Sequence, residues 1–260
     1  MIKLIASDMD GTVLRNGAQE LPEGFTDLIL RLKDCGVHFV AASGRQYQNL
    51  RRLFGPIQNE ISYIAENGSL CTHEGKIFYQ GEIDHSLGLE IIKEIKKIPE
   101  LEIALACERT TYVEHKNPEF LRYLREEVKY DITPVDDFSS VTDPFLKIAV
   151  CDFQGSSRYD SHFRELFKER INVVTSGNLW FDFIAPNANK GLALQSLMDQ
   201  LHVKKRECMA FGDEYNDVEM LLTAGSSYAM KTCAPGVDRF ATATTATVEE
   251  VLEELLEEYE

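Results

Sequence analysis

The 260-residue chain carries 43 acidic and 27 basic residues, so its formal net charge is −16 at pH 7 and its isoelectric point is near 4.8. Such an acidic protein is a poor candidate for nonspecific binding to nucleic acid or to anionic membranes. An anionic substrate would need a locally positive site, made by a metal ion and a few placed cations.

Length and residue usage indicate a globular protein with one large domain or two modest ones. The hydrophobic fraction of 44% is sufficient for a sizeable core. The six cysteines are scattered and show neither a CxxC pair nor a zinc-ligand spacing, so we expect buried thiols. The sequence opens on a strand pattern without a signal peptide or an apolar run of membrane length, which predicts a cytoplasmic protein.

The first predicted element is a short buried strand over residues 2–6, followed by Asp8, Asp10 and Gly11. Glycine accepts a positive φ, so a sharp turn is expected here, at the end of the sheet where α/β proteins bind ligands. Two carboxylates this close repel each other unless a cation lies between them, and Mg²⁺ is the usual cation at oxygen-rich sites. The alternative is an ordinary Asp-x-Asp-Gly turn; a Ca²⁺ loop is weaker, since no closing glutamate follows.

The next elements predict a strand–helix–strand unit. A helix over residues 25–35 precedes a strand over residues 37–42, which stops at Ser43-Gly44-Arg45. Short links between these elements imply parallel strands and a right-handed crossover, so Ser43 arrives beside Asp8. The pattern then predicts a helix over 46–54, a strand over 62–65 and a hairpin over 70–79. Asn67, in the turn after the third strand, is left open between a crevice residue and a turn former.

From about residue 82 the pattern changes, and we predict a second, α+β domain inserted into the first. Its helices are expected over 83–98, 119–128 and 156–169, and its strands over 103–107, 111–114, 146–152, 173–175 and 180–184. The earlier pattern resumes at Asn189. It predicts a helix over 190–201, a strand over 207–211, a helix opening at Asn216-Asp217, a strand over 226–230 and a final helix. Seven glutamates between residues 249 and 260 are expected to form a solvated face of that helix.

Polar residues stand directly after several predicted strands or at the first residues of the helices that follow them. In a parallel sheet these strand ends converge on one crevice. The polar residues are Asp8 with Asp10, Ser43, Lys190, and Asp213 with Asn216 and Asp217. Each has a plain alternative: a turn for Ser43, a surface position for Lys190, and helix N-caps for the later aspartates. Together, a group of carboxylates, one lysine and one hydroxyl suit phosphoryl transfer, which depends on positioning and charge neutralisation.

The chain resembles the haloacid dehalogenase superfamily of phosphatases, in particular the Cof-type subgroup with a large αβ cap. Four motifs of that family match, and these are Asp8-Met9-Asp10-Gly11-Thr12, Ser43-Gly44-Arg45, Lys190-Gly191 and Gly212-Asp213-Glu214-Tyr215-Asn216-Asp217. The resemblance implies an α/β fold, with a Rossmann-like, doubly wound parallel-sheet core and an inserted α+β cap. The catalytic core would comprise residues 1–81 and 187–260, and the cap, which sets substrate specificity, residues 82–186.

The resemblance also implies roles. Asp8 would be the nucleophile that forms an aspartyl-phosphate, Asp10 the general acid and base, and Lys190 the cation that neutralises the phosphoryl group and holds Asp8. Mg²⁺ would be held by Asp8, the main-chain carbonyl of Asp10, and Asp213, with Asp217 acting directly or through water. The substrate-binding set would be Ser43, Gly44, Arg45 and Asn216, with Asn216 a better candidate than Thr12 for helping Ser43.

The resemblance implies a small phosphomonoester as substrate, such as a sugar phosphate, and the oligomeric state is not readable from the sequence. Three rival functions stay open: a phosphomutase with the same intermediate, a signalling receiver domain, and a catalytically silent binding protein. Receivers are shorter and carry the phosphorylated aspartate on a later strand. A nucleotide-linked dehydrogenase is disfavoured because no GxGxxG follows the first strand.

Overall fold

The structure is a computed structural model that describes residues 1–175 and 178–259. It divides into two compact units: unit 1 comprises Met1–Tyr79 and Asn189–Glu260, and unit 2 comprises Gln80–Ala188. Each unit has its own sheet and its own hydrophobic core.

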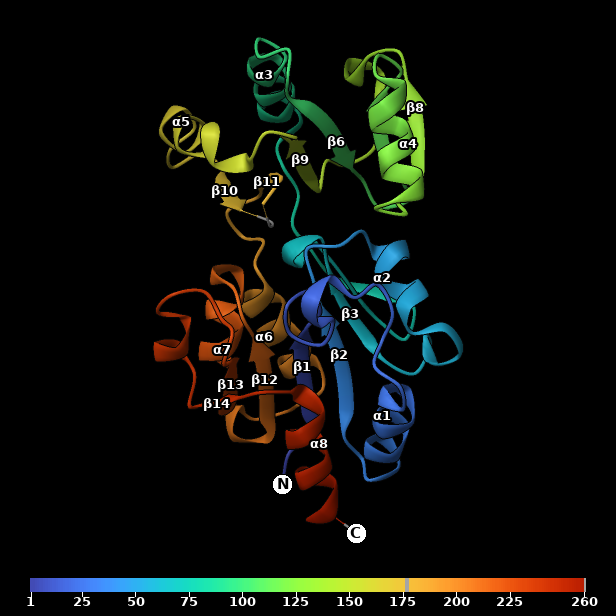
Figure 1. The fold of residues 1–260 in the computed structure, drawn as a ribbon, viewed down its shortest axis with the longest axis vertical. Helices are drawn as coiled ribbons and strands as arrows, with labels where there is room; N and C mark the ends of the chain where they lie inside the picture. Colours follow the sequence, from blue (N-terminus) through green and yellow to red (C-terminus); the bar gives the residue numbers. More distant parts are fainter. Residues whose placement is uncertain (176–177, 260) are drawn as a thin grey trace. The chain divides into compact units, whose positions relative to one another are not determined.

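Unit 1 is built on an eight-stranded sheet with the order β14-β13-β12-β1-β2-β3-β4-β5 (Figure 1). Its strands are β1 (Leu4–Asp8), β2 (His38–Ala42), β3 (Ser62–Ala65), β4 (Leu70–His73), β5 (Lys76–Gln80), β12 (Cys208–Gly212), β13 (Ser226–Met230) and β14 (Ala243–Thr245). Parallel pairs run from β14 through β1 to β3, and β4 pairs antiparallel with β3.

Helices cover both faces of this sheet. On one face lie α1 (Phe25–Asp34), α2 (Tyr47–Leu53) and α8 (Val248–Glu257); on the other lie α6 (Lys190–Gln200) and α7 (Val218–Thr223). Successive strand residues point to opposite faces, so Ile5 packs with the first group and Leu4 and Ala6 with the second. The predicted α/β fold with a doubly wound sheet is confirmed, and burial on both faces explains the unbroken apolar runs of its strands.

The register of the parallel strands aligns the carboxyl ends of the central strands with one another. Asp8 at the end of β1 lies opposite Ala42 at the end of β2, and Ser7 lies opposite Phe211 in β12. The residues that follow these strands therefore emerge at the same edge of the sheet. The predicted site residues lie along this edge.

Unit 2 contains a six-stranded sheet with the order β10-β11-β9-β6-β7-β8. Its strands are β6 (Glu102–Ala106), β7 (Thr111–Glu114), β8 (Ile132–Val135), β9 (Lys147–Cys151), β10 (Asn172–Thr175) and β11 (Trp180–Ile184). The helices α3 (His85–Ile95) and α5 (Asp160–Leu166) pack on one face, and α4 (Pro118–Glu126) packs on the other. Neighbouring strands are antiparallel except β7 and β8, which are parallel.

Two strands were not predicted, and both are edge strands. β8 contains Pro134, which lowers a strand prediction because proline cannot donate to the ladder, but an edge strand tolerates it. β14 has only three residues, Ala-Thr-Thr, and shows no apolar pattern. The helix expected over 156–169 is also shorter, because a 3₁₀ turn over Ser156–Arg158 precedes α5.

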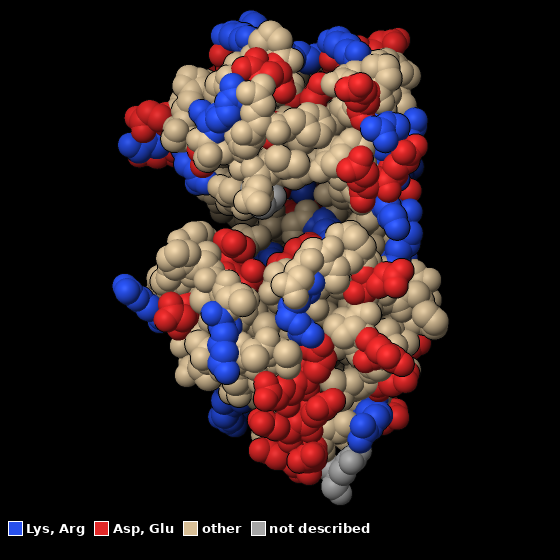
Figure 2. All heavy atoms as spheres, in the orientation of Figure 1, with Lys and Arg blue, Asp and Glu red and all other residues tan. Residues whose placement is uncertain are grey.

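The glutamates of α8 form an acidic face, visible as a red patch in Figure 2. Val248, Val251, Leu252, Leu255 and Leu256 bury the opposite face, as the sequence predicted. Glu260, the last member of the acidic run, lies outside the described residues. Cys71, Cys107, Cys151 and Cys208 are buried as expected, whereas Cys35 and Cys233 are half-buried. Among the described residues, no helix combines the length and the apolar character needed to cross a membrane.

Candidate active site

The carboxyl end of β1 delivers a buried aspartate. Asp8 is the last residue of β1 and is 5% exposed. The chain then turns at Gly11, whose φ is +89°. A Cβ atom at Gly11 would lie 2.1 Å from Oδ2 of Asp213, so glycine is needed for this turn to pack against the residue that follows β12.

A buried lysine joins two of the predicted acidic residues. Nζ of Lys190 donates to Oδ1 of Asp8 and to Oδ1 of Asp217, each at 2.6 Å, and the lysine is 0% exposed. Lys190 is the first residue of α6, and Asn189 caps the helix by accepting the N–H of Leu192 at 2.7 Å. Burying an ammonium is costly unless anions pair with it, and here two carboxylates do.

The start of α6 is held by close backbone packing. At Gly68, whose φ is +96°, a Cβ atom would lie 2.5 Å from the main-chain carbonyl carbon of Asn189. At Gly191, a Cβ atom would lie 2.6 Å from the main-chain carbonyl of Glu219 in α7. The turn after β3 and the side of α7 therefore fix where Lys190 begins its helix.

The residues after β12 supply two more carboxylates. Oδ2 of Asp217 accepts the N–H groups of Asp213 and Glu214, both at 3.0 Å, which closes the turn after the strand. Thr12 donates from Oγ1 to Oδ1 of Asp213 at 2.9 Å. No firm role was predicted for Thr12. Its contact is with an acidic residue of another motif, and the spacing of the motifs does not indicate such a contact.

Asp8, Asp213 and Asp217 form a group in which one oxygen of each lies within 4.8 Å of the others. Oδ2 of Asp8 is buried and has no hydrogen-bond partner within the described ranges. Three carboxylates around one ammonium leave an excess of negative charge. This set of hard oxygen donors fits a divalent cation such as Mg²⁺.

The pKa values point the same way. Burial raises the pKa of Asp8 well above its usual range; Lys190 opposes this, and Asp217 and Asp213 add to it. Burial, with repulsion from Asp217, raises the pKa of Asp213 to about 6, although the hydrogen bond from Thr12 opposes the shift. Burial alone would lower the pKa of Lys190, but Asp217 and Asp8 raise it above its usual value. Lys190 therefore stays charged, and it is the carboxylates that lack a sufficient counter-charge.

The second motif lies beside a residue that the sequence left undecided. Ser43 is 1% exposed, and its Oγ accepts the N–H of Arg45 at 3.1 Å. A Cβ atom at Gly44 would lie 3.0 Å from Oδ1 of Asn67, and Asn216 donates from Nδ2 to the same oxygen at 3.0 Å. Asn67, with φ +58°, therefore serves both as a turn residue and as the link between the second and fourth motifs.

The side chain of Asp10 is not one of the three clustered carboxylates. It receives two hydrogen bonds from Arg45, Nε to Oδ2 at 2.8 Å and Nη2 to Oδ1 at 2.6 Å. The Asp10 side chain is 54% exposed and that of Arg45 is 14% exposed. The structure thus brings Asp8, Lys190, Asp213 and Asp217 together, and it places Asp10 with Arg45.

Comparisons with known proteins agree with this fold. A sequence model of the haloacid dehalogenase-like hydrolases matches residues 5–255. YbjI of Escherichia coli K12, a 5-amino-6-(5-phospho-D-ribitylamino)uracil phosphatase, is 32% identical over 237 residues, which cover 91% of this chain and 88% of YbjI. An HMP-PP phosphatase of Escherichia coli O6:H1 is 27% identical over 240 residues, which cover 90% of this chain and 86% of the relative. A crystal structure from Eubacterium rectale matches with a TM-score of 0.87 and 27% identity, covering 100% of this chain and 99% of the other.

The family match spans both segments of unit 1 and the whole of unit 2. The four motifs that pointed to the family lie at the edge of the unit 1 sheet, where parallel strands end. This chain therefore belongs to the haloacid dehalogenase-like hydrolase family, and the relatives compared above are phosphatases.

Proposed function

We propose that the protein is a Mg²⁺-dependent phosphatase that dephosphorylates a small phosphorylated metabolite through an aspartyl-phosphate on Asp8. One observation carries the proposal: Lys190 holds Oδ1 of the buried Asp8 at 2.6 Å, while Oδ2 has no partner in the described part of the chain. A carboxylate positioned in this way is a suitable nucleophile. The phosphatase relatives support the reaction class.

Asp8 and Asp213 are the side chains that we assign to Mg²⁺, together with the main-chain carbonyl of Asp10. Both oxygens of Asp217 already accept hydrogen bonds from the protein, so we assign Asp217 to contact through water and to charge balance. The ion, when bound, neutralises charge on the transferring phosphoryl group.

In the first step, an oxygen of Asp8 forms a bond to phosphorus, and the bond between phosphorus and the leaving oxygen breaks. Lys190 orients the carboxylate and supplies positive charge beside it. Because burial raises the pKa of Asp8, the ionised nucleophile depends on this neighbour. In the second step, water attacks the phosphorus of the aspartyl-phosphate and releases inorganic phosphate and the Asp8 carboxylate.

Asp10 is the residue we assign to proton transfer. It would give a proton to the leaving oxygen in the first step and take one from the attacking water in the second. Arg45 holds both of its carboxylate oxygens, so the side chain must leave the guanidinium to reach the substrate. Asp10 is exposed enough to rotate, whereas the buried cluster is not.

Ser43 is assigned to the phosphoryl oxygens. Its Oγ accepts the N–H of Arg45, which leaves its own proton for a substrate oxygen. Gly44 and Asn216 border the same place through Asn67. No single contact suffices, since one charged hydrogen bond contributes only about 1.5–3 kcal/mol, whereas enzymes accelerate phosphate-monoester hydrolysis by up to about 10²¹-fold.

Unit 2 is proposed as the cap that sets specificity, because lids of this kind exclude water and contact the leaving group. The name of YbjI points to a phosphorylated uracil derivative, and we propose substrates of that size for this chain. The direct test is release of inorganic phosphate from a panel of phosphorylated metabolites, measured with an excess of Mg²⁺ and again with EDTA. Turnover with Mg²⁺ and none with EDTA is expected.

The same panel separates the rival functions. A phosphomutase would convert hexose phosphates into isomers without net phosphate release, and a silent binding protein would do neither. Either result, obtained across the whole panel, would contradict the proposal.

A further inference from the structure

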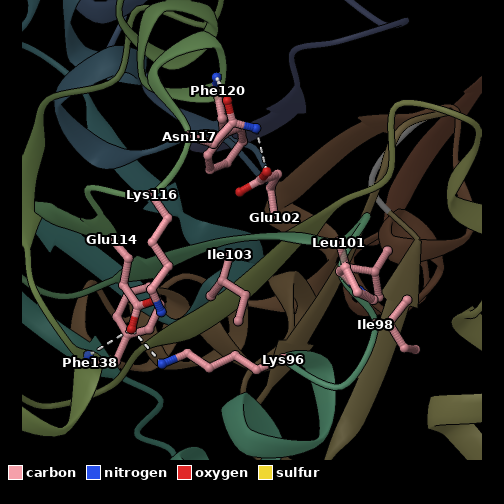
Figure 3. Close-up of a pocket in the computed structure, with 11 residues that line it drawn as sticks. Lys96, Ile98, Leu101, Glu102, Ile103, Glu114, Lys116, Asn117, Phe120 and Phe138 are labelled. Carbon is pink, nitrogen blue, oxygen red and sulfur yellow. Dashed lines mark hydrogen bonds and ion pairs between the residues drawn. The ribbon is translucent and has the colours of Figure 1, made fainter.

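Unit 2 contains a pocket that is not part of the site described above. Its volume is about 420 Å³, within the range of small-molecule sites. The end of α3, the start of β6, the end of β7 and the start of α4 form its walls. Figure 3 shows Ile103 near its middle, with Glu102, Asn117 and Phe120 at one end and Lys96, Lys116 and Glu114 at another.

The pocket lies at the end of the unit 2 sheet opposite to the places where the chain enters and leaves the unit. β6 begins beside Cys151 with Glu102 and ends beside Lys147 with Ala106. Lys147 lies next to Ile184, where the chain leaves. Glu102 is therefore at the end of β6 that lies away from Ile184, where the chain leaves the unit.

The two lysines of the pocket are already paired. Glu114 accepts hydrogen bonds from both Lys96 and Lys116, and its side chain is only 8% exposed. Lys96 also forms an ion pair with Asp137 at 3.4 Å. Two cations and two carboxylates balance one another at this end, so it offers no net charge to an anion.

Glu102 is different, because no cation among the described residues pairs with it. Its Oε1 accepts a hydrogen bond from Nδ2 of Asn117 at 2.5 Å. The side chain is half-buried, and burial raises its pKa. A half-buried carboxylate next to apolar side chains and an aromatic ring is suited to an organic cation, which would restore the hydrogen bonds and the counter-charge that water supplies poorly there.

We propose that this pocket binds a small organic ammonium ion across the start of β6, with the charged nitrogen at Glu102 beside Phe120 on the α4 face of the sheet and the apolar body against Ile103, Leu101 and Ile98 on the other face. The ligand class is a primary amine with an apolar body. The size of the pocket accommodates a ring with a short aminoalkyl chain. The site is a binding site only, and it stands whether or not the protein acts as a phosphatase.

Three probes of one shape test the charge preference on the full chain. 2-Phenylethylamine, 2-phenylethanol and 3-phenylpropanoate differ mainly in charge at the end of the chain, and each is titrated while amide chemical shifts are followed by NMR. We expect the amine to shift amides of residues 98–103 and 114–120 and to bind at least tenfold more tightly than the other two. Equal or tighter binding by the alcohol or the carboxylate, or no shift with the amine, would overturn the proposal; this series requires no variant.

A variant then tests the residue. Glu102→Gln keeps the shape and the hydrogen bond from Asn117 but removes the charge, and it should raise the Kd of the amine at least tenfold. Glu165→Gln is the matched control, because Glu165 is 81% exposed on α5 and does not line the pocket. An unchanged Kd in Glu102→Gln, or an equal loss in both variants, would show that the amine binds elsewhere.

Discussion

The two units of the molecule differ in how their strands pair and in where their charged residues gather. The central strands of unit 1 are parallel, so the chain leaves each of them at the same edge of the sheet. Most neighbouring strands of unit 2 are antiparallel, so the chain leaves them alternately at opposite ends. Within the described residues, the close group of three acidic side chains is found in unit 1.

Buried charge is also arranged differently in the two units. In unit 1, Lys190 contacts two carboxylates and a third lies beside them. In unit 2, the buried Lys147 pairs with Asp182 on the neighbouring strand at 3.5 Å. A pair of opposite charges is what a fold needs to bury a lysine, whereas an excess of acids destabilises the fold and calls for a bound cation. The excess of negative charge, more than the burial of charged groups, therefore distinguishes the site in unit 1 from the buried ion pair in unit 2.

The largest effect is expected from removing the nucleophile. Asp8→Asn should lower kcat/KM by about 10⁴-fold or more, yet leave the free energy of unfolding no lower, since it relieves crowding among the acids. Phosphate release and urea unfolding measure the two quantities. Asp136→Asn, at an exposed position of unit 2, is the control and should change neither. Activity within tenfold of the wild type in Asp8→Asn would remove Asp8 from its assigned role.

Lys190→Met tests the charge excess directly. It leaves the buried carboxylates without their cation, and we expect a loss of about 3–5 kcal/mol in the free energy of unfolding, together with loss of activity. Lys97→Met is the control, because Lys97 is 61% exposed and its pairing with Glu94 lies on the surface; it should change stability by less than about 0.5 kcal/mol. Similar losses in both variants would mean that the cluster does not depend on its lysine.

Acid should weaken unit 1 through the half-buried side chain of His38. Oγ of Ser62 hydrogen-bonds His38 at 2.8 Å and His73 at 2.7 Å, and burial, with repulsion from His73 and Lys33, lowers the pKa of His38 to about 4. Its folded-state pKa lies below the unfolded value near 6.5, so its contribution of about 3 kcal/mol is complete above pH 6.5 and is lost as the pH falls toward 4.

Urea unfolding at about pH 7, 5.5 and 4 measures this loss, and His38→Gln should flatten the pH dependence. The one tryptophan, Trp180, lies in unit 2, so its fluorescence reports on that unit, while circular dichroism reports on both. We expect acid to change the dichroism before the fluorescence. The same pH dependence in wild type and His38→Gln would assign the acid sensitivity to other groups.

A smaller effect is expected from the cation itself. Mg²⁺ at about 100 times its Kd should stabilise the protein by about 2.7 kcal/mol, measured as a rise in Tm relative to EDTA. Asp213→Asn should remove most of this rise. Because thermal unfolding does not require turnover, the measurement tests the metal site even when the substrate is unknown. A rise of equal size in Asp213→Asn would show that Mg²⁺ binds elsewhere.

The sequence was most informative where function depends on strand ends. A short apolar run precedes Asp8, and another precedes Ser43. Because the strands pair in parallel, the residues that follow such runs lie at the same edge of the sheet. Short apolar runs also predicted the α/β class. They predicted β3 and β11 with the same first and last residues that the structure shows. β8 was missed because Pro134 argues against a strand unless the strand is known to lie at an edge, which only the completed sheet reveals.

Side-chain partners were harder to foresee. The hydrogen bond between Asn216 and Asn67, and that between Thr12 and Asp213, join residues far apart in the chain. The pairing of Asp10 with Arg45 depends on a rotamer, and residue spacing does not specify rotamers. Sequence reasoning can therefore name the residues of such a site and its edge of the sheet, while their hydrogen bonds have to come from the structure.

The tight contact of Gly68 with Asn189 lies where the chain returns to unit 1, one residue before Lys190. It holds the returning segment directly before Lys190, and both residues of the contact belong to unit 1 and not to the stretch between residues 80 and 188. If unit 2 is the cap that we propose, its sequence can therefore change, and its substrate preference with it, while the proposed catalytic lysine stays where it is. A single glycine, Gly68, would in that way allow related enzymes to keep the same chemistry while their substrates diverge.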